Sequence, residues 1–338
     1  MKTQYTVTVL VPVYRPDRTL HELLRRLSCQ KMLPDRVILL NTTEEGIREK
    51  SGDEVSECAQ QYKDLFPSFS VLNVEKSDFD HGATRDLGFR FSDTDLVLCM
   101  TQDALPRDTQ LIGKLAAAFD DPLVAAAYGR QLPKKMSGPL ETYSRQYNYP
   151  GQSCVKGLED LDKLGIKTFF CSDVCAMWRR DTYFDLGGFE ARTIFNEDMI
   201  LAGHLIRAGY RIAYVAEAQV YHSHSYSGIK QLKRNFDLGV SQADHPEVFS
   251  MVSSAREGIG LVKETAVFLI KSGKMADVGR LVWQSSCKFL GYKLGKNYKR
   301  LPGPLILKLT DNPSYWGKCN VLKPKPNTHR TQKSAKIY

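Results

Sequence analysis

Short apolar runs alternate with amphipathic segments along the first part of the chain. Runs of aliphatic and β-branched residues between turn-forming residues predict buried strands. These runs lie at 7–13, 36–40, 70–74, 95–101 and 123–128. Apolar residues at helical spacing predict helices between them, at 18–27, 53–66, 82–91 and 106–119. The alternation predicts an α/β fold whose mostly parallel central sheet carries helices on both faces.

The pattern becomes less regular after the last of these strands. Residues 129–165 are polar and rich in tyrosine, and they show no clear period. A strand, a helix and an extended segment are predicted after them, at 168–178, 196–208 and 210–221. From about residue 227 the pattern is helical and basic. The predicted organisation is a domain over 1–226, a basic amphipathic helical region over 227–317, and a disordered basic tail over 318–338.

The net charge of +9 comes from the last quarter of the chain. Residues 1–250 hold 30 Lys and Arg against 34 Asp and Glu, a net of −4, whereas 251–338 hold 17 against 4, a net of +13. A localised basic segment indicates an anionic partner or a solvated region. An anionic membrane surface fits this segment at least as well as nucleic acid does. The acidic main body argues against nucleic acid.

Cysteine usage and the first residues of the chain bear on its compartment. The eight cysteines are scattered without a CxxC pair, which is typical of reduced thiols. The polar residues 1–6 lead directly into a predicted strand, so we expect no signal peptide. No apolar run approaches the ~20 residues that span a bilayer. We therefore expect a cytoplasmic protein.

Candidate chemistry begins where the strand at 95–101 ends. Thr101, Gln102 and Asp103 follow this strand, and ligands in open α/β sheets bind beyond the carboxyl ends of strands. Asp103 is therefore a candidate ligand for Mg²⁺, which takes few protein oxygens and completes its shell with phosphates. The alternative is a helix N-cap ahead of Pro106.

A second acidic segment opens the helix predicted at 196–208. Asn196 is a good cap, and Glu197 and Asp198 are either ordinary first-turn acids or carboxylates held over a pocket. His222 and His224 follow the segment at 210–221 and share one strand face. One of them is a candidate to complete a metal site or to contact a leaving phosphate.

Three further segments suit a nucleotide. Pro12 and Tyr14 close the first strand and offer a floor for a base, and Asn41 is either a pyrimidine contact or a turn residue. Gly82 allows close approach of the backbone. Arg85 suits a diphosphate because its planar fork binds two oxygens, with a surface ion pair to Asp86 as the alternative.

These residues, taken in order, resemble glycosyltransferase family 2 enzymes with the GT-A fold. VPVY at 11–14, TQDA at 101–104 and NED at 196–198 carry the resemblance, which covers about residues 5–230. GRQLP at 129–133 and YHSHSYS at 221–227 resemble the rhamnosyltransferase-type branch. The resemblance implies a nucleotide-binding half over about 1–130 and an acceptor half over about 131–226.

The resemblance also implies roles for single residues. Asp198 matches the catalytic base, and Glu197 stands beside it. Asp103 matches the last Asp of the metal-binding DxD and would bind Mg²⁺ or Mn²⁺ together with His222 or His224. Thr101 stands where the first Asp is usual. The nucleotide-sugar donor would contact Pro12, Tyr14, Asn41, His81, Arg85, Thr101, Gln102 and Asp103, and the acceptor would contact Trp178 and Arg179.

The implied activity is inverting transfer of a sugar to a glycan or polyprenyl-diphosphate-linked acceptor in cell-surface polysaccharide synthesis. Rhamnose from dTDP-rhamnose is the donor expected from the resemblance. The enzyme would lie on the inner face of the plasma membrane through its basic region. One alternative is a nucleotidyltransferase, although residues 14–17 do not form its Gly-rich loop. The other is a nucleotide-sugar-binding module without turnover, which Thr101 favours.

Overall fold

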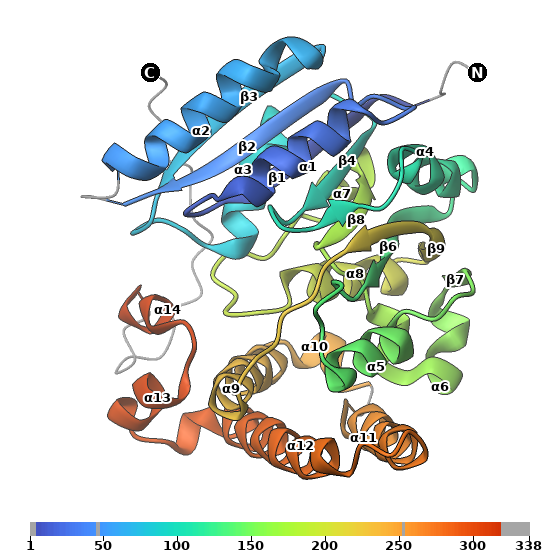
Figure 1. Ribbon diagram of the computed structural model, residues 1–338, viewed down its shortest axis with the longest axis vertical. Coiled ribbons are helices and arrows are strands. Elements are labelled where there is room, and N and C mark those ends of the chain that lie inside the picture. The colour runs from blue at the N-terminus through green and yellow to red at the C-terminus, as the bar shows by residue number, and fades with distance from the viewer. Residues whose placement is uncertain (1–4, 45–47, 252–253, 319–338) are drawn as a thin grey trace.

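The computed structural model describes residues 5–44, 48–251 and 254–318, and these contain one nine-stranded sheet (Figure 1). The strand order is β3-β2-β1-β4-β8-β6-β9-β5, and β7 pairs with β9. The strands are β1 (Val7–Val13), β2 (Arg36–Thr43), β3 (Ser68–Glu75), β4 (Leu96–Met100), β5 (Leu105–Pro106), β6 (Val124–Leu132), β7 (Cys154–Lys156), β8 (Cys175–Arg179) and β9 (Arg211–Tyr221).

The sheet is mixed but mostly parallel, as predicted. β1 pairs in parallel with β2 and β4, and β2 pairs in parallel with β3. β8 is antiparallel to both β4 and β6, and β9 is parallel to β6, so β6 and β9 run in the same direction as β4. The carboxyl ends of β1, β2, β4, β6 and β9 therefore meet at one edge of the sheet.

Helices cover both faces of the sheet, which confirms the predicted α/β layers (Figure 1). One face packs on α1 (Arg18–Ser28), α2 (Arg48–Tyr62) and α4 (Leu111–Ala116), and the other on α3 (His81–Phe91), α7 (Arg180–Asp185) and α8 (Glu197–Arg207). Leu20, Leu23, Leu24 and Leu27 form the buried stripe of α1. Asp17 caps this helix by accepting a hydrogen bond from the Thr19 backbone N–H.

Three predicted elements are wrong in extent. Residues 106–119 are not one helix, because Leu105–Pro106 pairs with β9. This pair forms the outermost strand of the sheet, where the missing backbone N–H of proline is tolerated. Only Leu111–Ala116 is α-helical, followed by a 3₁₀ turn. The strand predicted at 168–178 is confined to β8. The irregular stretch contains α5 (Pro139–Asn148) and α6 (Leu161–Leu164), and α5 begins at a proline, which is favourable at the first helical position.

Short 3₁₀ segments connect several of these elements. They are η1 (Lys63–Leu65), η2 (Ala117–Asp120), η3 (Leu158–Asp160), η4 (Gly165–Phe169) and η5 (Tyr298–Arg300).

The last third of the described chain is helical. Its helices are α9 (Gly228–Asp244), α10 (Pro246–Phe249), α11 (Ser254–Lys271), α12 (Met275–Lys296), α13 (Gly303–Leu309) and α14 (Pro313–Lys318). Across the described residues, every helix is too short or too polar to cross a bilayer. The tail predicted over 318–338 lies outside the described residues from 319 onward, and the boundary near 226 stays a prediction.

These helices pack on the domain that precedes them. Phe236 and Val240 of α9 form one apolar cluster with Ile194, which lies in the segment that leads to α8. Ser241 of α9 donates a hydrogen bond to the Phe195 carbonyl oxygen at 2.6 Å. The position of the α8 start therefore depends on the C-terminal helices as well as on the sheet.

Candidate active site

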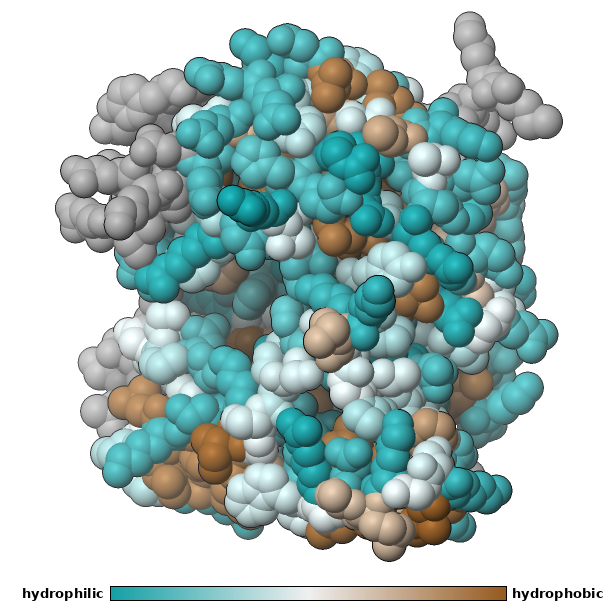
Figure 2. Space-filling model, viewed as in Figure 1, coloured by the Kyte–Doolittle hydropathy of each residue, from teal (hydrophilic) through white to brown (hydrophobic). Residues whose placement is uncertain are grey.

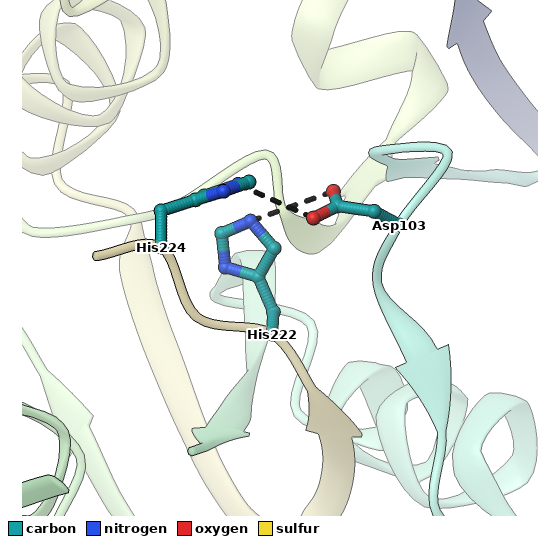
Figure 3. Close-up of side chains that lie close together, drawn as sticks. All are labelled: Asp103, His222 and His224. Atoms are coloured by element: carbon teal, nitrogen blue, oxygen red, sulfur yellow. Dashed lines mark ion pairs between the residues drawn. The ribbon is translucent and has the colours of Figure 1, made fainter. Parts of the chain in front are cut away.

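Asp103 and two histidines meet where β4 and β9 end (Figure 3). His222 Nε2 lies 3.5 Å from Asp103 Oδ1, and His224 Nε2 lies 3.2 Å from Oδ2, so each imidazole faces a different carboxylate oxygen. The possible ligand atoms of the three residues lie within 4.8 Å of one another. His222 is buried, whereas Asp103 and His224 are partly exposed. The fold thus brings together three residues that the sequence analysis assigned to a metal.

Gln131 determines which nitrogen of His222 faces Asp103. Arg145 donates from Nη1 to Gln131 Oε1, and this oxygen can only accept. His222 Nδ1 lies 3.0 Å from the same oxygen and is therefore the donor. The lone pair of Nε2 is left facing Asp103 Oδ1. Burial lowers the pKa of His222 to about 3, which keeps the ring neutral. A neutral imidazole held in this way beside a carboxylate is a donor set that fits a divalent cation.

Lys134 and Thr101 make two further contacts to Asp103. Lys134 Nζ lies 3.2 Å from Oδ2, and Thr101 Oγ1 donates to Oδ1 at 3.1 Å. Burial alone would raise the pKa of Asp103, but the hydrogen bond from His224, the neighbouring imidazoles and the Lys134 ammonium hold it below its usual range. Asp103 is therefore ionised. It is no helix N-cap, because the next element is the strand β5.

Two carboxylates contact one guanidinium at the start of α8, and a third lies beside them. Arg85 Nη1 lies 2.8 Å from Glu197 Oε1, and Arg85 Nε lies 3.4 Å from Asp173 Oδ2. Two backbone N–H groups hold the carboxylate of Asp198, that of Asp173 at 3.2 Å and that of Met199 at 2.8 Å. Arg85, Glu197 and Asp173 are buried. The structure thus pairs the predicted Glu197 with Arg85, adds Asp173 to this pair, and holds the predicted Asp198 beside them through the Asp173 backbone.

The surroundings of Asp198 raise its pKa to about 7. Burial is the main cause and the charge of Glu197 adds to it, while the two backbone hydrogen bonds and Arg85 act in the opposite direction. Burial also raises the pKa of Asp173 well above its usual range. The cluster therefore retains a proton near neutral pH. A carboxylate that exchanges its proton near pH 7 suits general-base catalysis.

Arg85 occupies a different place from the one expected. Its guanidinium contacts two carboxylates and donates to the His81 carbonyl oxygen at 3.1 Å, so it is not directed to an open phosphate subsite. The alternative pairing with Asp86 is also wrong, because Asp86 pairs with Arg90. His81 itself is exposed at the start of α3, and its ring packs edge-on against Phe79 at 5.0 Å.

Gly82 makes the close approach that the sequence predicted, and its neighbour is a loop of this chain. A Cβ atom on Gly82 would lie 2.3 Å from the Glu190 carbonyl oxygen. Asp80 caps α3 by accepting from the Ala83 N–H at 2.8 Å, and its other oxygen accepts from the Arg192 N–H at 3.1 Å. The start of α3 therefore holds the loop that leads to the carboxylates of α8.

Asn196 does not cap α8 with its side chain as predicted. Its backbone is left-handed, with φ of 65°, which asparagine tolerates better than most residues. The side chain is 6% exposed, and its Nδ2 finds no hydrogen-bond partner among the described residues. A buried amide donor is therefore left beside Glu197 and Asp198.

The loop after β1 contacts the end of β4. Gln102 Oε1 accepts from the Tyr14 N–H at 3.0 Å, and Gln102 Nε2 donates to the Tyr14 carbonyl oxygen at 3.2 Å. The Tyr14 ring is 37% exposed, and its hydroxyl donates to Glu44 at 3.0 Å. Pro12 is half-buried within β1, opposite Leu40. A flat aromatic surface is thus held at the carboxyl edge of the sheet.

Asn41 lies in β2 rather than in a turn, and it pairs with an amide on the next strand. Its Nδ2 donates to Asn73 Oδ1 at 2.9 Å, while its Oδ1 finds no hydrogen-bond partner among the described residues. Both amides line a cavity between the sheet and α2, together with Thr43, Val55, Ser56, Ala59 and Val71. The acceptor oxygen of Asn41 is therefore buried beside this cavity and unpaired among the described residues.

Trp178 and Arg179 do not lie together at the site. Trp178 is buried, and its indole Nε1 donates to Asp173 Oδ1 at 2.9 Å, so it supports the carboxylate cluster. Arg179 pairs with Leu96 at the beginning of β4, which is the opposite edge of the sheet from Asp103. Its guanidinium donates there to the Phe119 carbonyl oxygen at 3.0 Å. The expected acceptor contact is therefore wrong for Arg179.

Three residues of the site were not predicted from the sequence: Asp173, Gln131 and Lys134. Asp173 was placed inside a predicted strand, but β8 begins two residues later, so Asp173 lies at the functional edge. Gln131 and Lys134 lie at or just beyond the end of β6, where strand-end reasoning could have found them. Gln131 Nε2 also donates to Ser172 Oγ at 3.1 Å, which links the histidines to the segment that holds Asp198.

Comparison with known families agrees with this arrangement. The profile described as Glycosyl transferase family 2 matches residues 8–186, which contain β1, β4 and β8 and the residues that follow them. The chain belongs to glycosyltransferase family 2. Residues of the family region thus supply Asp103, Arg85 and Asp173, and the residues beyond it supply Asp198 and both histidines.

Two curated relatives match this glycosyltransferase over nearly its whole length. It is 37% identical over 312 residues to the O-antigen chain rhamnosyltransferase RfbN of Salmonella typhimurium, which covers 92% of this chain and 96% of the relative. It is 34% identical over 312 residues to the O-antigen chain rhamnosyltransferase WbaN of Salmonella anatum, which covers 91% and 95%. The predicted rhamnosyltransferase-like branch is therefore confirmed.

Solved structures of other glycosyltransferases share the fold. The mannosyltransferase PcManGT of Pyrobaculum calidifontis, in complex with GDP-Man and Mn²⁺, matches with a TM-score of 0.56 at 14% identity, over 94% of this chain and 87% of that one. S. aureus TarS 1–349 in complex with UDP-GlcNAc matches with a TM-score of 0.52 at 13% identity, over 87% and 91%. At this identity the likeness shows the GT-A fold alone.

Proposed function

We propose that this glycosyltransferase transfers rhamnose from dTDP-rhamnose to a hydroxyl group of a glycan acceptor, with inversion of configuration. The observation that carries the proposal is Asp198, whose carboxylate is fixed by two backbone N–H groups and whose pKa is raised to about 7. The two rhamnosyltransferase relatives, which match over more than nine-tenths of this chain, support rhamnose as the sugar and a cell-surface polysaccharide as the product.

The proposed reaction is a single displacement. Asp198 takes the proton from the acceptor hydroxyl while the oxygen of that group forms a bond to the anomeric carbon. The bond from this carbon to the diphosphate oxygen breaks on the opposite face, and its electron pair leaves with the nucleoside diphosphate. One base suffices because the leaving group departs as a stable anion. The Asp173 and Met199 backbone N–H groups position Asp198, and Glu197 and Arg85 set the charge around it.

Asp103, His222 and His224 are the residues that would hold Mg²⁺ or Mn²⁺. When bound, such an ion stabilises the negative charge that develops on the leaving diphosphate. Lys134 adds a cation of the chain itself, because its ammonium group lies 3.2 Å from Asp103. Tyr14, Pro12 and Asn41 would receive the nucleoside at the ends of β1 and β2.

The acceptor is proposed to be a growing glycan on a polyprenyl diphosphate at the inner face of the plasma membrane. The relatives are named as O-antigen chain enzymes, which supports a glycan acceptor. The net charge of +13 in residues 251–338 supports a location of the enzyme beside an anionic membrane surface. Asn196 offers an unpaired amide donor beside Asp198, where an acceptor hydroxyl must bind.

A donor screen tests this function. Purified protein with Mg²⁺ or Mn²⁺ and a synthetic lipid-linked acceptor is incubated with dTDP-, UDP- and GDP-sugars, and products are identified by mass spectrometry. We expect a product from dTDP-rhamnose, its loss in Asp198→Asn, and its persistence in Asp181→Asn, where the side chain is 91% exposed and remote from the cluster. Binding of dTDP-rhamnose without turnover by the wild type would instead support a binding module.

A further inference from the structure

The C-terminal helices expose a row of large apolar side chains. On α12 these are Met275, Val282, Trp283, Phe289 and Leu290, and on α11 they are Ile259, Val267 and Ile270. Their exposed fractions run from 45% to 70%. We call these eight residues the α11–α12 face. Figure 2 shows hydrophobic side chains along the lower rim of the molecule, where Figure 1 places α11 and α12.

Most of the face on α12 is separate from the stripe that packs on the protein. Trp283 lies between the two, because a Cβ atom on Gly228 at the start of α9 would be 2.2 Å from its indole Nε1, while the side chain is still 57% exposed. Leu281, Cys287, Gly291 and Gly295 are the buried positions of α12. A Cβ atom on Gly291 or Gly295 would lie 2.1 Å from a carbonyl oxygen of α9, so this side of α12 is in close contact with α9. The exposed Met275, Val282 and Phe289 recur every seven positions, so they lie together on another side of the helix. The helix is therefore apolar on both sides, and one side has no cover in the described structure.

Basic residues border the α11–α12 face. Lys263, Lys271, Lys274, Arg280 and Lys293 are exposed on or between the two helices. Residues 254–318 hold 12 Lys and Arg against 4 Asp and Glu, and residues 319–338 add five more basic residues and no acidic one. Apolar side chains bordered by lysine are typical of segments that lie in a membrane interface, because lysine stems extend along apolar surface while their charges reach the headgroups.

The positive charge around the α11–α12 face indicates which partner binds there. A second copy of this chain docked through the same face would bring two basic borders together, which is unfavourable. A neutral bilayer would leave the lysines without counter-charges. We propose that the α11–α12 face lies flat on an anionic phospholipid bilayer, with Trp283 and Phe289 at the level of the headgroups. This surface binding does not require that the chain spans the membrane.

The docking would also orient the active site. α12 packs on α9, and α9 bonds to Phe195 just before the carboxylates of α8. A bilayer bound to α11 and α12 is therefore connected through α9 to the segment that carries Glu197 and Asp198, and it fixes the orientation of the active site relative to the membrane. This consequence for a lipid-linked acceptor rests on the proposed function, whereas the binding itself does not.

Tryptophan fluorescence tests the proposal directly on the full-length protein. Of the three tryptophans, Trp178 and Trp316 are 1% and 5% exposed, whereas Trp283 is 57% exposed. An emission change on adding vesicles therefore reports Trp283. With vesicles of phosphatidylglycerol and phosphatidylcholine in equal amounts, we expect a blue shift and co-flotation of the protein. With phosphatidylcholine alone, we expect neither. The shift should vanish in Trp283→Phe, which keeps flotation.

Matched variants separate docking from folding. Phe289→Ser combined with Lys271→Glu should lose most of the flotation, while Phe91→Ser combined with Lys63→Glu, which changes exposed residues outside the face, should keep it. Equal flotation of both pairs, or no blue shift with anionic vesicles, would overturn the proposal. A blue shift that grows with protein concentration without vesicles would assign the face to a second copy instead. Turnover of a soluble acceptor by the wild type distinguishes failure of docking from failure of the enzyme.

Discussion

The backbone N–H of Asp173 donates to Asp198 Oδ2 at 3.2 Å, so the residues just before β8 hold the carboxylate at the start of α8. The same residue places its own carboxylate 3.4 Å from Arg85 and accepts from Trp178. Asp173 thus joins the sheet, α3 and α8 at one point. The position of Asp198 follows from this contact, whereas its raised pKa comes mainly from burial, with the charge of Glu197 added to it.

The pH profile of the reaction should show an acid limb near pH 7. Burial, with the charge of Glu197 added to it, raises the pKa of Asp198 to about 7. Because the base must be ionised to accept a proton, kcat/KM should fall about tenfold per pH unit below this value. Initial rates from pH 5 to 9, with the acceptor well below its KM, measure the limb. A profile flat down to about pH 5 would remove Asp198 as the base.

Replacing Arg85 should shift the acid limb of the pH profile to higher pH. In Arg85→Gln the cluster loses its one guanidinium, so the remaining carboxylates raise the pKa of Asp198 further. The buried Glu197 also loses its ion-pair partner, which costs about 3–5 kcal/mol of stability. Arg85→Lys keeps a positive charge, so it should show a smaller shift of the acid limb and a smaller loss of stability than Arg85→Gln. The pH profile and urea unfolding measure them, and Arg90→Gln, which breaks an exposed pair with Asp86, serves as the control. An unshifted limb in a folded Arg85→Gln enzyme would contradict this role.

Gln131 should control metal affinity without being a ligand. Gln131→Leu removes the acceptor that fixes the proton on His222 Nδ1, so Nε2 is no longer held with its lone pair toward Asp103. The loss of such a supporting contact typically weakens metal binding about 10–100-fold. Titration of the protein with Mn²⁺, followed by electron paramagnetic resonance, measures the affinity. Gln110→Leu on the surface should bind as the wild type does. Equal Mn²⁺ affinity for both variants would show that Gln131 does not control metal binding.

Two glycines of α12 should respond in opposite directions to alanine. A Cβ atom at position 291 would meet the Leu232 carbonyl oxygen at 2.1 Å, so Gly291→Ala should separate α12 from α9 and cost about 1–3 kcal/mol. Gly279 has no atom within 4 Å of the same position, so Gly279→Ala should be neutral or stabilise the helix by up to about 1 kcal/mol. Denaturant unfolding of both variants tests the packing. Equal stabilities would contradict the close contact between α9 and α12.

The sequence predicts the elements with regular periods and the polar residues at strand ends. The apolar stripe of α1 could be placed from its helical spacing. The residues after β4 and β9 could be placed because the carboxyl ends of parallel strands meet at one edge of the sheet. Asp173 could not, because the length of β8 depends on its pairing with β4 and β6, which no local pattern reveals. The role of Arg85 also escaped prediction, since a guanidinium that suits a phosphate suits two carboxylates equally well.

The central claim is that Asp198 serves as the base in a single displacement at the anomeric carbon of rhamnose. The most direct measurement is the anomeric configuration of the product, determined by nuclear magnetic resonance after transfer from dTDP-rhamnose to a defined acceptor. We expect a configuration opposite to that of the donor, formed by the wild type and not by Asp198→Asn. Retained configuration, or an undiminished rate in Asp198→Asn, would contradict it.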